Sequence, residues 1–523
     1  MSFTSWQYAL FLPLVVVLYW PLPRLGRMAL LLAASYFFYG LWDLRFLALL
    51  MASTGIDYFC ARSMVGIREG RAKILGTTLA PIVWLGGCGF LGQSVICISP
   101  TSLIVAGIFP VLFVPMHEWI WTWSEEKRRR GFMWLSVLTN LAVLGFFKYF
   151  GFFASSLLTL LGAVGIDPGW TLPHIILPVA VSFYTFQSVA YAVDVYKGKL
   201  QPATDLLTFS AYLAFFPQLV AGPIERPAKF MPQFTHAARW EWEHLHAGLR
   251  LLLIGAFKKV FVADNCAEIA NYVFHPDSTP NAPWALLGIL AFAFQIYGDF
   301  SGYTDLARGS ARLLGINLST NFRFPYLASG PSDFWQRWHI TLSSWFRDYV
   351  YIPLGGNRCG PTRTVVNLWI TMVLAGLWHG ASWTFVLWGA YHAVMLTAYR
   401  LIPALGALET ATTRGKRLFA ISFMFVLTLF GWAIFRAQTL GGLEHWMQAM
   451  TVWTASATWF RAACWLLIHI LPLILLQIAS RHLEDESELG HLSWWSRGLI
   501  FFALFLLFAS SSTSEQEFIY FQF

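Results

Sequence analysis

Residues 367–392 read NLWITMVLAGLWHGASWTFVLWGAYH and contain no Asp, Glu, Lys or Arg. Apolar segments at roughly 364–380 and 383–399 meet at Gly380, and each comes close to the ~20 residues that a membrane helix needs. One histidine, His379, lies at their junction next to Trp378. The stretch therefore predicts two membrane helices with a titratable side chain between them.

The composition of the whole chain agrees with this stretch. Of its 523 residues, 57% are hydrophobic, 17% aromatic and 12% charged, whereas a soluble domain is about 45–50% apolar and about 25% charged. The mean hydropathy is +0.57, which excludes an ordinary soluble enzyme. Similar apolar stretches along the chain predict an all-α polytopic membrane protein with about 11–13 membrane helices, some of them tilted or re-entrant.

We expect one integral membrane domain over residues 1–523, because no linker rich in Pro, Gly or Ser and no internal repeat divides the chain. Within it, residues 1–200 form the N-terminal helices and residues 201–400 the core that carries the motifs. Residues 401–509 form the C-terminal helices, and residues 510–523 form a tail.

Basic residues gather on alternate connections between the apolar stretches. The second and fourth connections hold only Arg45. The first, third and fifth hold Arg24, Arg27, Arg62, Arg68, Arg71, Lys73, Lys127, Arg128, Arg129 and Arg130. Cytoplasmic loops are rich in Lys and Arg, so these three connections are predicted to be cytoplasmic and the N-terminus extracytoplasmic. Arg481 and Arg497 likewise place the tail outside.

The net charge of +8 fits such loops and does not indicate nucleic acid. Six scattered cysteines form no CxxC pair, so neither a disulfide framework nor a metal site is predicted. Gly87, Gly89 and Gly92 match GxGxxG, but they lie inside an apolar stretch without a βαβ pattern, so no bound cofactor is expected.

The segment 295–326 places Asp299, Asp305 and Arg308 in apolar surroundings. Titratable residues at membrane depth are costly, and they usually pair with one another or line a cavity. Asp305 and Arg308, three residues apart, suit a structural ion pair. Asp299 either lines a polar tunnel or caps a helix.

Two histidines have functional and structural interpretations. His339 lies in the segment 331–356, whose tryptophans and arginines are typical of an interfacial helix, so it is either an ordinary interfacial residue or part of a site. Burial of His379 would favour a neutral imidazole that can accept a proton, as a general base must.

These segments resemble the membrane-bound O-acyltransferase (MBOAT) superfamily, specifically its bacterial alginate O-acetylation branch. The resemblance covers most of the chain except roughly 75–130. It rests on YGDFSGYTDLARG, NFRFPY, DFWQRWHITLSSWFRDYVYIPLGG and LAGLWHGASWTFVLWG, with LLAASYFFYGLWD and FFPQLVAGPIERPAKFMPQF upstream.

The resemblance implies a helical bundle around a central tunnel and acyl transfer from a thioester donor to a hydroxyl. In the family pattern the intramembrane histidine corresponds to His379 and a second important histidine to His339. Asp299, Asn321, Arg323 and Trp378 lie within matched motifs, and they are candidates for lining the tunnel or binding the donor.

The implied donor is cytoplasmic acetyl-CoA, a substrate rather than a bound cofactor. The implied acceptor is an exported polysaccharide such as alginate, reached directly or through a periplasmic SGNH-type acetyltransferase partner at the bacterial inner membrane. Membrane lipid is the other partner. D-alanyl transfer to a cell-wall polymer remains an alternative, as do a transporter and a secretion scaffold, since composition alone does not separate these classes.

The tail ends in FIYFQF, residues 518–523. An aromatic hexapeptide of this kind also ends relatives in the branch that the chain resembles. A terminus this apolar either docks into a groove or anchors at the membrane interface. In the first case the Tyr520 hydroxyl could carry the acyl group as a covalent relay.

Overall fold

The computed structural model describes residues 1–91, 100–173, 175–219, 222–235, 238–454, 456–480, 489, 492–511, 516 and 518–519, without the side chains of 85–91 and 100–110. These residues form helices and connections and contain no strand, which confirms the all-α class. They group into two compact units, Met1–Leu245 with Ser310–Leu318, and His246–Gly309 with Ser319–Phe523. The four segments expected from the sequence do not coincide with these units, and the expectation of one integral domain stays a prediction.

The first unit is built of short and medium helices. They are α1 (Trp6–Tyr19), α2 (Arg24–Gly40), α3 (Leu44–Met64), α4 (Arg71–Leu91), α5 (Pro100–Trp121), α6 (Glu125–Leu144), the π-helical turn η1 (Gly145–Tyr149), α7 (Phe150–Ala163), α8 (Val181–Tyr196), α9 (Leu206–Leu213), α10 (Phe216–Leu219), α11 (Pro227–Phe230) and α12 (Pro232–Thr235).

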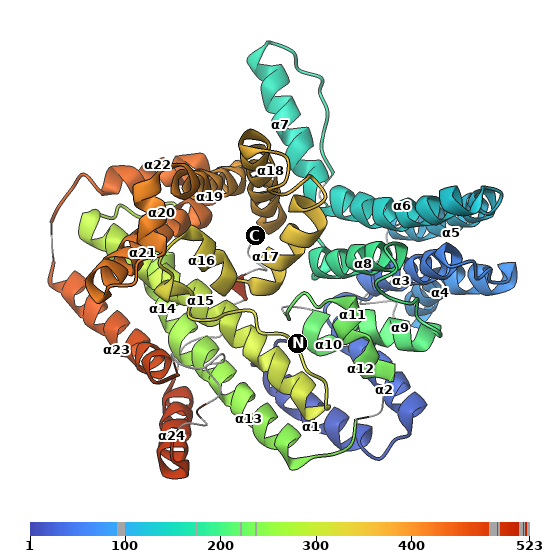
Figure 1. Ribbon diagram of the computed structural model, residues 1–523, viewed down its shortest axis with the longest axis horizontal. Coiled ribbons are helices and arrows are strands. Elements are labelled where there is room, and N and C mark those ends of the chain that lie inside the picture. The colour runs from blue at the N-terminus through green and yellow to red at the C-terminus, as the bar shows by residue number, and fades with distance from the viewer. Residues whose placement is uncertain are drawn as a thin grey trace. The chain divides into compact units, whose positions relative to one another are not determined.

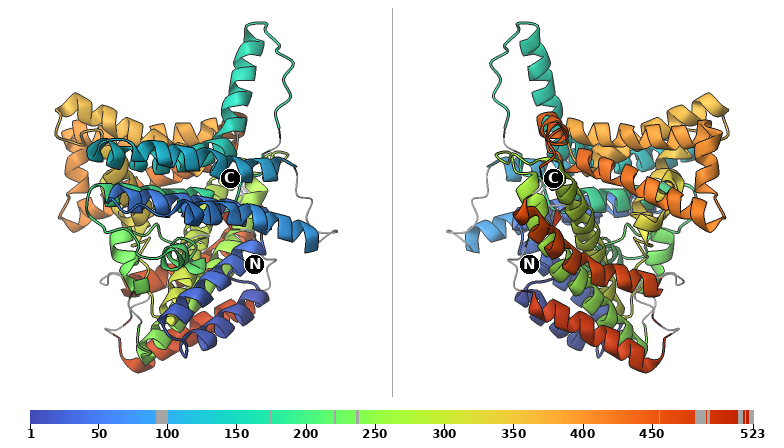
Figure 2. Two further views of the ribbon diagram at one scale, coloured as in Figure 1. Left: turned by 90° about the vertical axis from the view of Figure 1, so that its right-hand side faces the viewer. Right: turned by 90° about the vertical axis from the view of Figure 1, so that its left-hand side faces the viewer.

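Helix α3 is the centre of this unit. It packs against α4, α5, α6 and α8 (Figure 1), and most of its side chains are buried. Its buried Asp57 accepts hydrogen bonds from Ser136 Oγ at 2.6 Å and Asn140 Nδ2 at 2.8 Å, both on α6. A buried carboxylate needs such donors, so these bonds fix the register of α3 against α6. Helix α7 projects from this group in both figures (Figure 2).

The second unit holds the longest helix. Its elements are α13 (Trp242–Ala256), η2 (Phe257–Ala263), α14 (Asp264–Val273), α15 (Ala282–Leu313), η3 (Pro325–Leu327), α16 (Pro331–Arg337), α17 (Ile340–Phe346), η4 (Arg347–Tyr351), α18 (Pro361–His379), α19 (Trp383–Leu401), α20 (Pro403–Glu409), α21 (Arg414–Arg436), α22 (Leu440–Ala449), α23 (Ala457–Ser480) and α24 (Trp494–Ser510).

Helices α18 and α19 pack closely along each other because glycines lie at their contact (Figure 1). A Cβ at Gly376 would overlap the Phe385 carbonyl, and a Cβ at Gly389 would overlap that of Met372. Small residues allow membrane helices to approach this closely. The close packing holds the end of α18, and with it His379, against α19.

Five helical segments among the described residues are long and apolar enough to cross a membrane: Leu44–Met64, Glu125–Ala163, Ala282–Leu313, Arg414–Arg436 and Ala457–Ser480. The pair α19 and α20, bent by 100°, makes a sixth if it counts as one span.

This number, which covers the described residues only, is below the 11–13 expected from the sequence. Several apolar stretches fold into shorter helices, such as Trp6–Tyr19, Leu206–Leu219 and Trp494–Ser510. The membrane-protein class is confirmed, and the central tunnel stays a prediction.

Candidate functional site

His339 lies in the second unit, at the junction of α16 and α17, and its side chain is fully buried. Its backbone is left-handed (φ 42°, ψ 54°), a conformation that costs a residue with a Cβ about 1–2 kcal/mol. Strained backbone of this kind persists where surrounding contacts enforce it, and it is common at functional sites.

Asn321 supplies those contacts. Its side-chain oxygen accepts hydrogen bonds from Thr341 Oγ1 at 2.7 Å and Thr341 N at 3.3 Å, and its backbone carbonyl accepts from Ile340 N at 2.9 Å. The same side-chain oxygen lies 3.1 Å from His339 Nδ1. Because an amide oxygen only accepts, Nδ1 carries the proton and Nε2 presents its lone pair.

The protonation state of the His339 ring follows from its burial. His339 lies outside the helical segments that could cross a membrane. Burial lowers the pKa of His339 to about 3, so the imidazole is neutral at physiological pH. Its Nε2 is buried and has no hydrogen-bond partner among the described residues. Such an atom can accept a hydrogen bond from a substrate.

Trp378 contacts both histidines. Its ring centroid lies 5.8 Å from that of His339 and 5.1 Å from that of His379. His379, the last residue of α18, is 4% exposed and also contacts the rings of Trp388 at 4.9 Å and Phe435 at 5.3 Å. The structure therefore brings Asn321, His339, Trp378 and His379 into one buried cluster, which we call the histidine cluster.

A small cavity borders the histidine cluster at Asn321. It measures about 10 Å³ and is lined by Lys258, Ser301, Thr304, Asp305, Arg308, Thr320, Asn321 and Phe322. This volume is about that of one probe sphere, which suits a single water molecule.

Asp299 occupies a second buried cluster, formed with Lys259 and Asp264. Lys259 Nζ lies 2.9 Å from Asp299 Oδ1 and 2.8 Å from Asp264 Oδ1, and all three side chains are at most 4% exposed. We call these three residues the lysine cluster. Neither Lys259 nor Asp264 was predicted from the sequence, although the two lysines inside the apolar run of residues 247–263 were a signal that could have found this cluster.

The lysine cluster binds the backbone of the tail. Ile519 N donates to Asp299 Oδ2 at 2.6 Å, and Lys259 Nζ donates to Gln516 O at 2.8 Å. The centroid of the Phe518 ring lies 4.2 Å from that of Tyr303 and 6.0 Å from that of Phe300. The centroid of the Phe300 ring in turn lies 4.7 Å from that of His339. Gln516, Phe518 and Ile519 are thus docked inside the second unit. Tyr520 itself lies outside the described residues.

The remaining candidates lie elsewhere. The Arg323 side chain is exposed, whereas the histidine cluster is buried, and the Arg323 backbone N donates to Arg337 O at 2.9 Å. The expected ion pair is confirmed, with Arg308 Nη1 3.2 Å from Asp305 Oδ1, and Lys258 Nζ joins it at 2.8 Å from Asp305 Oδ2. Within the described ranges, no group of three or more His, Cys, Asp or Glu is arranged to hold a metal ion.

The apolar helices, with buried histidine, aspartate and lysine side chains among them, define a multi-pass membrane protein. Residues 202–436 match the model of the membrane-bound O-acyltransferase family. The chain is 36% identical over 474 residues to the probable alginate O-acetylase AlgI of Azotobacter vinelandii, a match that covers 90% of this chain and 80% of that protein.

Two further relatives act on other polymers. The peptidoglycan O-acetyltransferase of Helicobacter pylori is 34% identical over 388 residues, covering 69% of this chain and 72% of that protein. The teichoic acid D-alanyltransferase of Bacillus subtilis is 29% identical over 285 residues, covering 51% of this chain and 70% of that protein. The chain belongs to the membrane-bound O-acyltransferase family and is an O-acyltransferase.

Proposed function

We propose that this enzyme takes acetyl groups from cytoplasmic acetyl-CoA and passes them across the bacterial inner membrane for O-acetylation of an exported polysaccharide such as alginate. The observation that carries the proposal is the similarity to a probable alginate O-acetylase over 90% of the chain. D-alanyl transfer is the second candidate, supported by a relative that matches 51% of the chain.

In the proposed reaction the acceptor hydroxyl attacks the thioester carbonyl carbon of acetyl-CoA. His379 takes the hydroxyl proton as general base, the tetrahedral oxyanion collapses, and the CoA thiolate leaves and is protonated. His339, held by Asn321, positions the donor through its Nε2. Burial among aromatic rings keeps water from competing with the acceptor.

The distribution of basic residues predicts which parts of the chain lie on each side of the membrane. The basic connections face the cytoplasm, where the donor is, and the N-terminus and the tail are extracytoplasmic. A periplasmic SGNH-type acetyltransferase is the proposed partner that completes transfer to the polysaccharide.

The identity of the acyl donor is tested with the purified full chain in lipid vesicles. We expect CoA release from acetyl-CoA, and acetyl transfer when a soluble hydroxyl acceptor is supplied, with no use of a D-alanyl thioester on a carrier protein. Turnover of the D-alanyl thioester without turnover of acetyl-CoA would replace the proposal with the second candidate.

His339→Ala is expected to reduce acetyl transfer mainly through a higher KM for the donor. The reason is that a pKa lowered to about 3 makes the His339 imidazole a weak base, while the rigid turn holds its Nε2 in place, so it suits positioning more than proton transfer. Kinetics at varied acetyl-CoA separate the two roles, because a residue that takes part in chemistry would lower kcat at saturating donor. Activity within about twofold of wild type would remove His339 from the site.

We also propose that Tyr520 is the acyl relay, with its hydroxyl as the first acceptor. The docked backbone of Gln516 and Ile519 supports this role, because Ile519, the residue before Tyr520, is held in the unit that contains the histidine cluster. The Tyr520 oxygen would form an ester with the acetyl group. A second hydroxyl would then attack the acetyl carbonyl carbon, and the Tyr520 oxygen would leave and be protonated.

Tyr520→Phe is expected to lower polymer acetylation sharply while the protein level and donor binding stay normal, because only a hydroxyl is removed. Phe521→Tyr is the matched control for an aromatic change in the tail. Mass spectrometry of the C-terminal peptide should find an acetyl adduct in the wild type. Normal acetylation in Tyr520→Phe would show that the tail serves only as an anchor.

A further inference from the structure

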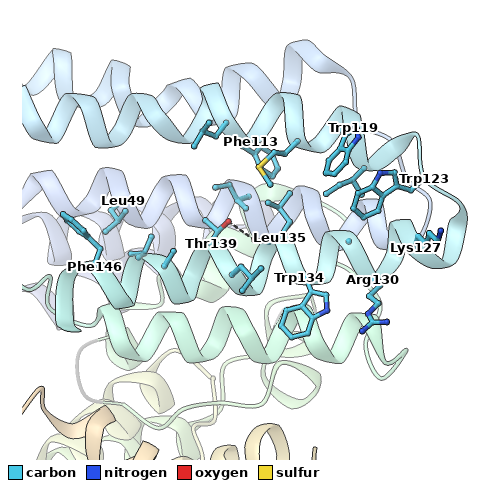
Figure 3. A pocket seen from close by; sticks show the side chains of 18 of the residues that line it. Leu49, Phe113, Trp119, Trp123, Lys127, Arg130, Trp134, Leu135, Thr139 and Phe146 are labelled. Atoms are coloured by element: carbon cyan, nitrogen blue, oxygen red, sulfur yellow. Dashed lines mark hydrogen bonds between the residues drawn. The ribbon is translucent and has the colours of Figure 1, made fainter. Parts of the chain in front are cut away.

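A long apolar groove lies in the first unit, where α5 and α6 both pack on α3. Its volume is about 1220 Å³, above the ~300–1,000 Å³ of pockets for drug-sized ligands. Figure 3 shows it running from Leu49 and Phe146 at one end to Trp119, Trp123 and Lys127 at the other.

The middle of the groove is lined mainly by apolar side chains. Thr139 is the polar side chain there, and its hydroxyl donates to Leu135 O at 2.7 Å within α6. Leu112, Met116 and Leu138, which also line the groove, are 41–57% exposed. In a membrane protein an exposed apolar lining faces hydrocarbon, so the occupant that matches the middle of the groove is a lipid acyl chain.

The tryptophan end of the groove is cationic. Lys127 and Arg130 line it, and neither forms an ion pair with any residue that the structure describes. Their basic neighbours point elsewhere, since Arg128 stacks on Trp121 at 4.6 Å and Arg129 donates to Tyr196 O at 3.2 Å. Tryptophan beside lysine and arginine is the arrangement found at the level of lipid head groups.

The length of the groove also suits a lipid. At ~1.5 Å per residue, α6 and η1 rise about 24 Å between Arg130 and Phe146, which is most of the ~30 Å hydrocarbon core of a bilayer. A ligand with an anionic head at Lys127 and Arg130 and extended apolar chains toward Phe146 fills this space.

We propose that the groove binds one anionic phospholipid, with its phosphate paired to Lys127 and Arg130 and its acyl chains along α5 and α6. By the distribution of basic residues it comes from the cytoplasmic leaflet. The proposal does not depend on the acyl-transfer chemistry, because none of the groove residues belongs to the histidine or lysine cluster.

The test uses the purified full chain in mixed micelles containing equal phosphatidylglycerol and phosphatidylcholine, with bound lipid counted by native mass spectrometry. The wild type should retain phosphatidylglycerol preferentially. Each basic residue near a head group contributes roughly a fivefold preference, so the Lys127→Glu, Arg130→Glu variant should lose the preference by roughly tenfold or more. Thr139→Trp, which fills the middle of the groove, should reduce retention of both lipids.

The matched control is Lys197→Glu with Lys199→Glu. This pair makes the same change of charge in the same unit on exposed residues that do not line the groove. It should keep the wild-type preference. An equal loss in the control, no preference in the wild type, or a second protein chain retained in place of lipid would overturn the proposal. Thermal unfolding with each lipid separates misfolding from lost binding, since a folded variant that cannot bind gains no stability from phosphatidylglycerol.

Discussion

His379→Ala should lower acyl transfer by roughly 10²–10⁴-fold, the contribution typical of a general base. The side chain contacts the rings of Trp378, Trp388 and Phe435, but the close contacts at Gly376 and Gly389 do not involve it, so the packing of α18 on α19 should survive its loss. The measurement is acetyl transfer at saturating donor, at equal protein level in the membrane.

His469→Ala is the control for this experiment. His469 is also a buried histidine of the second unit, with its ring packed on Phe261 at 4.8 Å, but it lies outside the histidine cluster. Its substitution should affect stability more than turnover. If His379→Ala acetylated the polymer at a near wild-type rate, the general base would have to be another residue.

The sequence predicted where the helices lie better than how long they are. Apolar stretches such as 364–380 and 383–399 became α18 and α19 with boundaries shifted by a few residues. Among the other apolar stretches of the chain, the one that includes residues 181–193 forms a helix that begins at Val181, and the one that includes residues 132–150 continues through a π-helical turn to Ala163. Hydropathy reports where a helix is tolerated, whereas its ends depend on turns and packing that a window average does not contain.

The histidine cluster was only partly predictable. His379 stood out because titratable residues in apolar runs are rare, whereas His339 and Asn321 were candidates through the motifs that contain them. The role of Asn321 in fixing the left-handed turn at His339 depends on contacts with residues about 20 positions away, which no local pattern encodes. Arg323 shares that motif, but its side chain is exposed. This difference from Asn321 also depends on the folded chain and could not be predicted from the motif.

The lysine cluster was missed because its members are distributed over η2, α14 and α15, and only the folded chain brings the two carboxylates to one ammonium. Lys259→Met should therefore destabilise the protein by about 3–5 kcal/mol, since it leaves Asp264 and Asp299 buried without their cation. Unfolding in detergent measures this loss. Lys416→Met, on an exposed site of the same unit, should change stability by no more than about 0.5 kcal/mol.

A second variant separates the stability of the fold from the docking of the tail. Lys259→Met combined with Asp264→Asn and Asp299→Asn removes all three charges, and replacing a buried ionic group by neutral residues is often close to neutral for stability. We expect stability to recover. The donor to Gln516 O is still missing, however, and the acceptor for Ile519 N has lost its charge. The tail should then become more accessible to protease than in the wild type. If the tail stays protected, packing of Phe518 on Tyr303 and Phe300 is sufficient to hold it, and the lysine cluster serves the fold alone.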